Sequence, residues 1–361
     1  CSKGRFGHRY LLEKERLQHT RVKEDGVFTE TTIEKALEYS ADRIKQIINQ
    51  YGEDAVAVFG SPKMSNEELY LLQKLARIGI KTNNIHSFSN LLRDNDETLA
   101  QQSIGAAAST ATLQDLEKAD YIIALNSNLS EENLVMEMKI KSAQKNGAKL
   151  VVVNSSEMKI TKYADLWIDS QKGTNTALLG GVMKHLADNK KIDDKYLKEN
   201  TSDFEIISKV FNDYDPATVS ASCAIDREKA EALIEIFDNP DNNVVFVYHA
   251  DNTREQSAHD LEAVMNLMMM TNRLFKENNG ILMLRDYVNS AGLLEMGVTP
   301  QFLPGFVPLD DKNGVDAINK IWNNKMNHSS PEPVNLKERL LQGDIKAVLI
   351  FGEDPLVTDD N

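Results

Sequence analysis

The chain has 361 residues, a length at which two or three domains and a sizeable core are expected. With 41% hydrophobic residues, 27% charged residues and a formal net charge of −14, it has the composition of a globular protein. That acidity argues against a nucleic-acid or anionic-membrane partner, because no basic field would attract phosphate groups. No apolar run reaches the ~18 residues of a membrane span, the start lacks a secretory signal pattern, and two cysteines fit a reducing compartment.

Helical and strand patterns alternate along the first part of the chain. Apolar residues recur at helical spacing over 33–48, after a capping-box pattern that begins at Thr31, and Gly52 supplies a stop. A short apolar strand is predicted over 55–59, and a second capping-box pattern at Ser65 predicts the helix that follows it.

The clearest unit lies near the middle of the chain. A buried-type strand over 121–125 is followed by a polar turn, a helix from about Ser130 that Gly147 stops, and a second strand over 149–153. A strand, a helix and a strand within ~30 residues predict a parallel sheet. The later strands predicted in the same way are 166–168, 244–248, 281–284 and 347–351.

These elements predict an α/β protein with two successive α/β halves, whose ligands would lie beyond the carboxyl ends of the strands. The chain opens on Cys1 rather than Met and stops soon after its last predicted strand. From that pattern we expect a piece of a longer protein.

Two polar turns follow neighbouring strands and are the first candidates for a binding site. Asn126, Ser127 and Asn128 follow one strand, and Asn154 and Ser155 follow the next. Their amides and hydroxyls could hold a nucleotide. Asn and Ser are also ordinary turn and helix-capping residues, and the sequence pattern by itself favours this second interpretation. The sequence has no glycine-rich phosphate loop of the usual kinds.

Histidines and cysteines add little chemistry by themselves. None of the seven histidines has the spacing of a zinc site. His249 follows a buried strand and is the most interesting of them, although a structural histidine with satisfied hydrogen bonds at a strand end is the commoner explanation. Cys223 has the surroundings of a buried thiol. The residues alone therefore indicate an α/β protein with a possible nucleotide crevice.

The opening of the chain resembles a known family. Residues 1–7, CSKGRFG, resemble the C-x-K-G-R-F-G run of formate dehydrogenases and of the molybdopterin-like subunit of NADH–quinone oxidoreductase, both of the molybdopterin oxidoreductase family. The further matching segments, in family order, are 61–77, 82–85, 115–120, 147–150, 164–165, 173–175, 304–305 and 351–355. The resemblance implies the fold of domains 1–3 of formate dehydrogenase and DMSO reductase, with parallel Rossmann-like sheets in two interleaved α/β domains.

By the same resemblance we expect residues 1–54 and 243–361 to form a split α/β domain, with an inserted Rossmann-like domain over 55–242. It also implies that Cys1 is the last ligand of a [4Fe–4S] cluster and that Lys3 lies between cluster and pterin. Such a cluster takes four thiolates, so the other ligands must lie upstream. We therefore expect no cofactor to be held by these 361 residues alone.

One departure from the family pattern falls on the metal ligand. In catalytic formate dehydrogenases the Cys or selenocysteine that binds molybdenum or tungsten stands where this chain has Met64. A thioether is neutral and a poor ligand for a hard, high-valent metal. The family's catalytic His has no match in this chain, because Ser87 and Phe88 stand near its position. His86 stands at the family's Asp position and is an unconvincing substitute. We therefore expect no catalytic residue in this chain.

The residues matching the nucleotide end of the cofactor also depart from the family. The aspartates of its D-P-R and P-G-T-D segments are matched by Asn154 and Asn175, and an amide satisfies only part of a guanine edge that a carboxylate would accept. We expect a degenerate, unused pterin–guanine dinucleotide site. Its members would be Lys3, Asn126, Ser127, Asn128, Asn154, Ser155, Gly173 and Asn175.

The main hypothesis is therefore a non-catalytic module of an electron-transfer protein that resembles the molybdopterin-like subunit of an NADH dehydrogenase. Its partners would be other subunits of a redox complex, and it would lie in the cytoplasm, peripheral to the inner membrane through those subunits. One alternative is a catalytic formate dehydrogenase-like subunit that binds molybdopterin guanine dinucleotide with molybdenum or tungsten. Another is a regulatory module that binds a guanine nucleotide.

Overall fold

The computed structural model describes residues 2–88, 96–105, 107–202, 214, 216–249, 255–285, 287–326 and 336–355. The chain divides into two compact units, of which unit 1 holds residues 1–92 and 287–361 and unit 2 holds residues 93–286. No helix among these described residues is long and apolar enough to cross a lipid bilayer.

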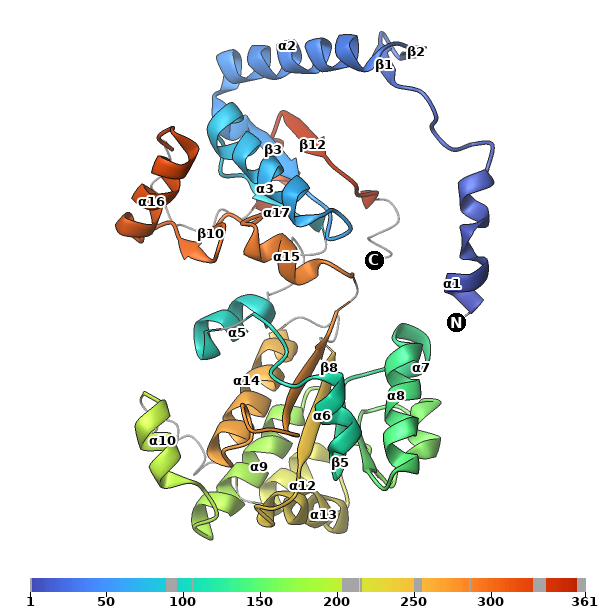
Figure 1. Ribbon diagram of the computed structural model, residues 1–361, viewed down its shortest axis with the longest axis vertical. Coiled ribbons are helices and arrows are strands. Elements are labelled where there is room, and N and C mark those ends of the chain that lie inside the picture. Colours follow the sequence, from blue (N-terminus) through green and yellow to red (C-terminus); the bar gives the residue numbers. More distant parts are fainter. Residues whose placement is uncertain are drawn as a thin grey trace. The chain divides into compact units, whose positions relative to one another are not determined.

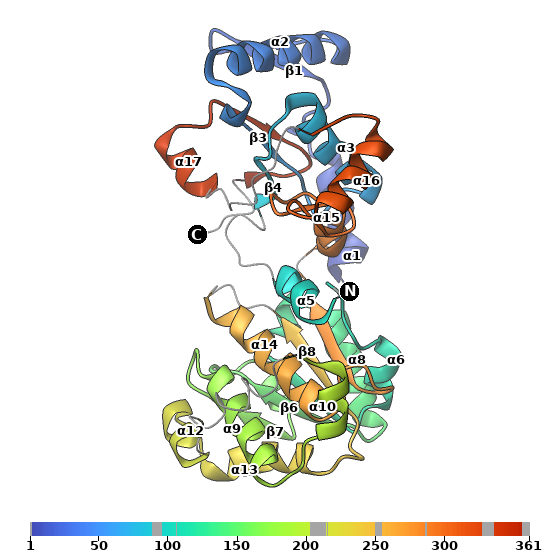
Figure 2. The ribbon, with the colours of Figure 1, turned by 90° about the vertical axis from the view of Figure 1, so that its left-hand side faces the viewer.

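Unit 1 is built on a three-stranded parallel sheet of order β12-β3-β4 (β3 and β12 in Figure 1, β4 in Figure 2). The strands of unit 1, which include the separate pairs β1-β2 and β10-β11, are β1 (Arg21–Glu24), β2 (Val27–Glu30), β3 (Val56–Phe59), β4 (Ile85–His86), β10 (Phe302–Leu303), β11 (Val307–Pro308) and β12 (Ala347–Ile350). Its helices are α1 (Ser2–Phe6), η1 (Gly7–Leu12), α2 (Ile33–Tyr51), η2 (Glu53–Ala55), α3 (Asn66–Lys74), η3 (Leu75–Ile80), α15 (Ser290–Glu295), α16 (Lys312–Trp322) and α17 (Leu336–Gln342).

The central strand β3 is covered on both faces, which explains why its sequence is apolar at every position. Val56 and Val58 face a cluster formed with α3 and α15, while Phe59 faces α17. Phe59 also stacks on Phe88 with ring centroids 4.2 Å apart. The helix after β3 begins as the sequence predicts, with a capping box between Ser65 and Glu68.

A buried arginine fixes one loop of unit 1. The Arg77 guanidinium, in η3, donates hydrogen bonds to the carbonyl oxygens of Gly297 at 2.8 Å, Thr299 at 2.6 Å and Phe302 at 3.0 Å. Burial lowers the pKa of Arg77 to about 9, so the group still carries its charge at neutral pH. These carbonyl partners replace the water that burial removes.

Unit 2 is built on a five-stranded parallel sheet of order β7-β6-β5-β8-β9. Its strands are β5 (Tyr121–Leu125), β6 (Lys149–Val153), β7 (Leu166–Ile168), β8 (Val244–His249) and β9 (Gly280–Leu284). Its helices are α5 (Asp96–Ile104), α6 (Leu113–Lys118), α7 (Leu129–Glu132), α8 (Leu134–Lys145), η4 (Ile160–Tyr163), α9 (Asn175–Asp188), α10 (Asp194–Asn200), α12 (Pro216–Cys223), α13 (Arg227–Asp238) and α14 (Glu255–Met270).

Helices cover both faces of this sheet, as a parallel sheet requires. Helices α6 and α8 lie on one face, and α9, α13 and α14 lie on the other (Figure 1, Figure 2). Alternate residues of β5 serve the two cores: Ile123 and Leu125 pack with α9 and α14, whereas Ile122 and Ala124 pack with α8. The parallel α/β architecture predicted from the sequence is confirmed.

The unit boundaries differ from those that the resemblance implied. The expected inserted domain ran over 55–242, but β3 pairs with β12, which places residues 56–92 in the split unit. Conversely, β8 pairs with β5 and β9 pairs with β8, so the chain from 243 to 286 belongs to the inserted unit. The boundaries are set by strand pairing between distant segments, which the turn-rich sequence at 239–243 does not reveal.

Candidate functional site

The sheet of unit 2 has a topological switch point between β5 and β8. The chain proceeds from β5 outward through β6 and β7, and then returns to β8 on the other side of β5. In open parallel sheets, ligands bind beyond the carboxyl ends of the strands at such a point. The residues there are the turn Asn126–Asn128 after β5 and His249 at the end of β8. We call this place the crevice of unit 2.

Asn126 begins the turn in a left-handed conformation, with φ +54°. Asparagine tolerates this conformation better than other residues that carry a Cβ atom. Both ends of its side chain are fixed, because Nδ2 donates to Asp260 Oδ2 at 2.9 Å and Oδ1 accepts from Asn175 Nδ2 at 2.8 Å. The turn is therefore tied to both α9 and α14.

Asp260 is the centre of a buried polar network that the sequence did not indicate. Its side chain, with the residue 3% exposed, also accepts hydrogen bonds from Asn175 Nδ2 at 3.1 Å and from Thr176 Oγ1 at 2.8 Å. Ser170 Oγ donates to Asn175 Oδ1 at 3.0 Å. The polar atoms of the Asn175 side chain are thus used inside the protein, so its amide is a framework group rather than a free contact for a ligand.

A second set of contacts joins the two strands at the switch point. Asn128 donates from its backbone to Glu132 Oε2 at 3.3 Å and from Nδ2 to Glu131 Oε2 at 2.9 Å. Glu132 Oε2 in turn lies 3.4 Å from His249 Nδ1. Ser127 is buried and donates to the Leu125 carbonyl oxygen at 3.0 Å. His249 therefore lies at the crevice, as its position after a strand suggested.

The turn after β6 contributes less. Asn154 is buried, its Nδ2 lies 3.2 Å from the sulfur of Met158, and its carbonyl oxygen accepts from Trp167 Nε1 at 3.2 Å. The neighbouring Ser155 is exposed. These contacts make Asn154 a residue that shapes the turn, which agrees with the ordinary-turn interpretation of the sequence.

The start of α9 offers backbone donors at the same end of the sheet. Gly173 has φ +84°, the N-cap Thr174 makes no side-chain capping bond, and the first turn holds no acidic residue. Such an uncapped helix start presents free N–H groups and the positive end of the helix dipole, which together suit a phosphate group. A nucleotide therefore fits this place better through backbone contacts than through the amide of Asn175.

Cys223 lies just behind this helix start and is free and buried. Its Sγ donates to the Thr174 carbonyl oxygen at 3.5 Å, and burial raises the pKa of the thiol. A thiol of this kind is unreactive, so the structure agrees with the buried-thiol interpretation.

Met64 lies in unit 1, in the turn after β3. Its backbone N–H donates to the Ser61 carbonyl oxygen at 3.0 Å, and its sulfur accepts from the Ser61 N–H at 3.5 Å. A Cβ atom added to Gly352 would lie 3.2 Å from Met64 Cγ and 3.6 Å from Sδ. The thioether thus packs on its own turn and on Gly352, and it supplies no negative charge for a hard metal ion.

The residues at the place of the family's catalytic histidine, which this chain lacks, form a structural set. Ser87 Oγ donates to Glu353 Oε1 at 3.1 Å, and the Phe88 N–H donates to Glu353 Oε2 at 3.0 Å. Burial lowers the pKa of His86 to about 4, and its buried Nδ1 has no hydrogen-bond partner among the described residues. His86 is therefore neutral at pH 7.

Two of the residues that the sequence singled out cannot be placed in a site. Cys1 lies outside the described residues, and Lys3 belongs to α1, where its side chain is not described. Among the residues that the structure does describe, no group of three or more His, Cys, Asp or Glu side chains could hold a metal ion. The cluster role of Cys1 stays a prediction.

Comparison with known proteins decides the family. The model of the molybdopterin oxidoreductase family matches residues 16–361. This chain belongs to the molybdopterin oxidoreductase family. The assignment agrees with the resemblance found in the sequence, and it accounts for the parallel α/β units.

Curated relatives of this molybdopterin oxidoreductase chain include formate dehydrogenases. It is 29% identical to the F420-dependent formate dehydrogenase subunit alpha of Methanocaldococcus jannaschii, over 99% of this chain and 52% of the relative. It is 27% identical to a putative formate dehydrogenase of Bacillus subtilis, over 100% of this chain and 37% of the relative. It is also 27% identical to the NADPH-Fe(3+) oxidoreductase subunit alpha of Geobacter sulfurreducens, over 99% and 42% respectively. The chain spans about half the length of these relatives or less.

A solved structure supports the fold. Acetylene hydratase from Pelobacter acetylenicus matches with a TM-score of 0.62 and 19% identity, over 77% of this chain and 37% of that protein. At this identity the likeness shows the fold alone.

Proposed function

We propose that this chain is the cofactor-binding portion of the large subunit of a formate dehydrogenase-type oxidoreductase. Two of the three relatives described above bear that name, and their alignments cover at least 99% of this chain. The main hypothesis drawn from the sequence, a subunit of an NADH dehydrogenase, has no such support among these relatives. The alternative of a formate dehydrogenase-like subunit is therefore preferred.

The observation that carries the proposal is the crevice of unit 2. Its uncapped α9 start beside Gly173 suits a phosphate group, and the fixed turn at Asn126 lies at the switch point of the sheet. We assign the nucleotide end of a molybdopterin guanine dinucleotide to this place. When bound, the cofactor supplies the redox chemistry, while these residues bind and orient its nucleotide.

The metal end fits less well. The thioether of Met64 is neutral, and its sulfur already accepts a hydrogen bond from Ser61 N–H. A molybdenum or tungsten ion would gain no charge from it. We therefore derive no catalytic step through a metal at Met64, and a metal that is held would take its ligands from other groups.

Melting experiments with GDP test the nucleotide assignment. A ligand that binds only the folded state raises the melting temperature, and ~100-fold excess over Kd adds about 2.7 kcal/mol. We expect millimolar GDP to raise the Tm, and Gly173→Val to remove the rise because a side chain at φ +84° distorts the phosphate-binding turn.

Gly147→Val is the matched control. Gly147 also has a positive φ, +111°, but it precedes β6 at the opposite end of the same sheet. It should lower the Tm by backbone strain and keep the rise with GDP. Equal responses of both variants, or no rise with the parent chain, would contradict the assignment.

A second candidate rests on Met64. Because its side chain packs as a structural residue, the module could serve as a scaffold in an electron-transfer complex and dock to partner subunits, with iron–sulfur clusters carrying electrons. Molybdenum, tungsten, iron and pterin content of the protein purified from its own organism separates the two. Stoichiometric molybdenum or tungsten with pterin supports the formate dehydrogenase type, whereas iron without them supports the scaffold.

A further inference from the structure

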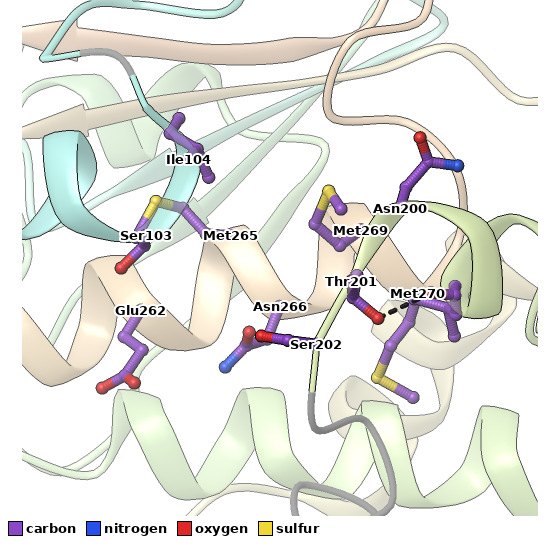
Figure 3. Close-up of a pocket in the computed structure, with 11 residues that line it drawn as sticks. Ser103, Ile104, Asn200, Thr201, Ser202, Glu262, Met265, Asn266, Met269 and Met270 are labelled. Carbon is purple, nitrogen blue, oxygen red and sulfur yellow. Dashed lines mark hydrogen bonds between the residues drawn. The ribbon is translucent and has the colours of Figure 1, made fainter.

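A pocket in unit 2 lies apart from the crevice and has no role in the proposed function. Helices α5, α10 and α14 line it, and its volume is about 340 Å³ (Figure 3). That volume falls in the range of small-molecule sites, about 300–1,000 Å³. None of the crevice residues lines it. The lining residues are Ser103, Ile104, Leu197, Asn200, Thr201, Ser202, Glu262, Met265, Asn266, Met269 and Met270.

The apolar part of the pocket is rich in sulfur. Met265, Met269 and Met270 come from α14, and Leu197 from α10 adds a buried aliphatic side chain. The sulfur of Met269 lies 3.8 Å from the Tyr196 hydroxyl, which holds that side chain in place. Thioethers are polarisable and adaptable, and they make favourable contacts with aromatic rings. This surface suits a flat or aromatic group.

The polar part of the pocket has free hydrogen-bonding groups. Within the described part of the chain, the side chains of Ser103, Ser202 and Asn266 have no hydrogen-bond partner. Asn200 donates to the Tyr196 carbonyl oxygen at 2.9 Å, and Thr201 donates to the Leu197 carbonyl oxygen at 2.7 Å. Hydroxyl and amide groups near the methionines are therefore available to a ligand.

Charge selects among the ligands that could enter. Glu262 is the one charged side chain among the eleven lining residues, and its Oε2 lies 3.8 Å from His259 Nδ1, outside the pocket. Among the lining residues that the structure describes none is basic, so an anion would meet repulsion from Glu262 and no attraction from these residues. A cationic group would pair with this carboxylate.

We propose that this pocket binds a small organic cation that carries an aromatic group. The ring lies against Met269, the partly exposed methionine of the three, next to the buried Met265 and Met270, and the ammonium group faces Glu262. The pocket shares no lining residue with the cofactor crevice, so the proposal does not depend on whether the chain binds a pterin.

Methionine-methyl NMR of the whole chain tests the proposal, with 2-phenylethylammonium as the probe. We expect its titration to shift the methyl signals of Met265, Met269 and Met270 and to leave Met64 and Met326 of unit 1 unmoved. Neutral 2-phenylethanol should bind roughly two- to five-fold more weakly, since one exposed ion pair is worth up to ~1 kcal/mol. The anion 3-phenylpropionate should be weaker still.

Two variants sharpen the test. Glu262→Gln keeps the pocket and should bring the ammonium and the alcohol to equal affinity. Ser103→Phe, at an exposed position of α5, should fill the entrance and abolish all the shifts. The proposal is overturned if the three methyl signals stay unmoved at millimolar probe, or if Glu262→Gln leaves a preference for the cation.

Discussion

Asn126 and Asp260, 134 residues apart in the chain, are joined by a 2.9 Å hydrogen bond from the side-chain amide of one to the carboxylate of the other. This bond ties the turn after β5 to α14, and the same carboxylate oxygen also accepts from Asn175 on α9. Three elements that surround the switch point therefore share one acceptor. The geometry of the crevice depends on that acceptor being a carboxylate.

Replacing this acceptor should destabilise unit 2. In Asp260→Asn, one carboxylate oxygen becomes an NH2 group, which must face the donors of Asn126 and Asn175 or the donor of Thr176. A buried polar group left without its partner costs about 1–3 kcal/mol, and more when charge is involved. We expect a loss of about 2–4 kcal/mol in the free energy of unfolding, measured with urea.

Glu262→Gln, two residues further along α14 and exposed, is the control for this measurement. A surface change of this kind stays within about 0.5 kcal/mol. A loss below 1 kcal/mol in Asp260→Asn would mean that the network contributes little to folding.

The conformation of Asn126 can be separated from its hydrogen bonds. Both Asn126→Gly and Asn126→Ala remove the bonds to Asp260 and Asn175, but only alanine is strained at φ +54°. We therefore expect both variants to lose stability and the alanine variant to be less stable by about 1 kcal/mol. Equal stabilities in thermal unfolding would show that the turn relaxes to another conformation.

Most strands could be predicted because each is a short apolar run bounded by turn residues. Strand β5 was predicted with its observed bounds, Tyr121–Leu125, and β8 differs from its prediction only by the addition of His249. The two-residue strand β4 was missed, since a run this short has no periodicity. The unit boundaries were missed for another reason. Strands β3 and β12 pair although they lie far apart in the chain, and a local sequence pattern does not indicate which distant strands pair.

The site was predictable only in part. Asn126 and Ser127 follow a recognisable strand, so their place at its carboxyl end could be inferred. Asp260 could not, because nothing in the spacing relates it to residues 134 positions earlier. One signal was present in the sequence: Asp260 lies at helical spacing from the buried Val264 and Leu267, so it falls on the apolar face of α14, whereas its neighbour Glu262 falls on the exposed face. An acid among buried neighbours needs partners, and that argument alone could have marked it.

His86 should give unit 1 a dependence of stability on acid pH. Burial lowers its folded-state pKa from 6.5 to about 4, so between these values the unfolded chain binds the proton and the folded chain does not. Stability from the neutral form is complete above pH 6.5 and is lost progressively as the pH falls from 6.5 to 4. The loss amounts to about 3 kcal/mol at 1.36 kcal/mol per pKa unit.

The parent chain and His86→Gln should therefore be compared across this range, since carboxylates also titrate there and only the difference reports on His86. We expect the difference in free energy of unfolding between the two proteins to change by about 3 kcal/mol between pH 6.5 and pH 4. Parallel curves would contradict the prediction, as would an NMR titration that places the imidazole pKa near 6.5.

Met64→Leu tests whether the thioether acts through packing or through a bond to metal. Leucine has nearly the volume of methionine, so it should keep the contact with Gly352 and lose only the weak bond from the Ser61 N–H, 3.5 Å long. Volume-conserving exchanges of this kind cost less than about 1.5 kcal/mol. We expect the metal and pterin content of the protein, and its formate oxidation where present, to stay unchanged.

Met64→Asp is the opposite change at the same position. It places a charge against the partly apolar surroundings of Met64, beside the cluster that includes Val58 and Leu69, and should cost several kcal/mol of stability.

Selective loss of molybdenum or tungsten in Met64→Leu, with folding intact, would show that the sulfur ligates the metal. In that case Met64 would leave its contacts with Ser61 and Gly352 when the cofactor binds, and the formate dehydrogenase assignment would gain its missing ligand.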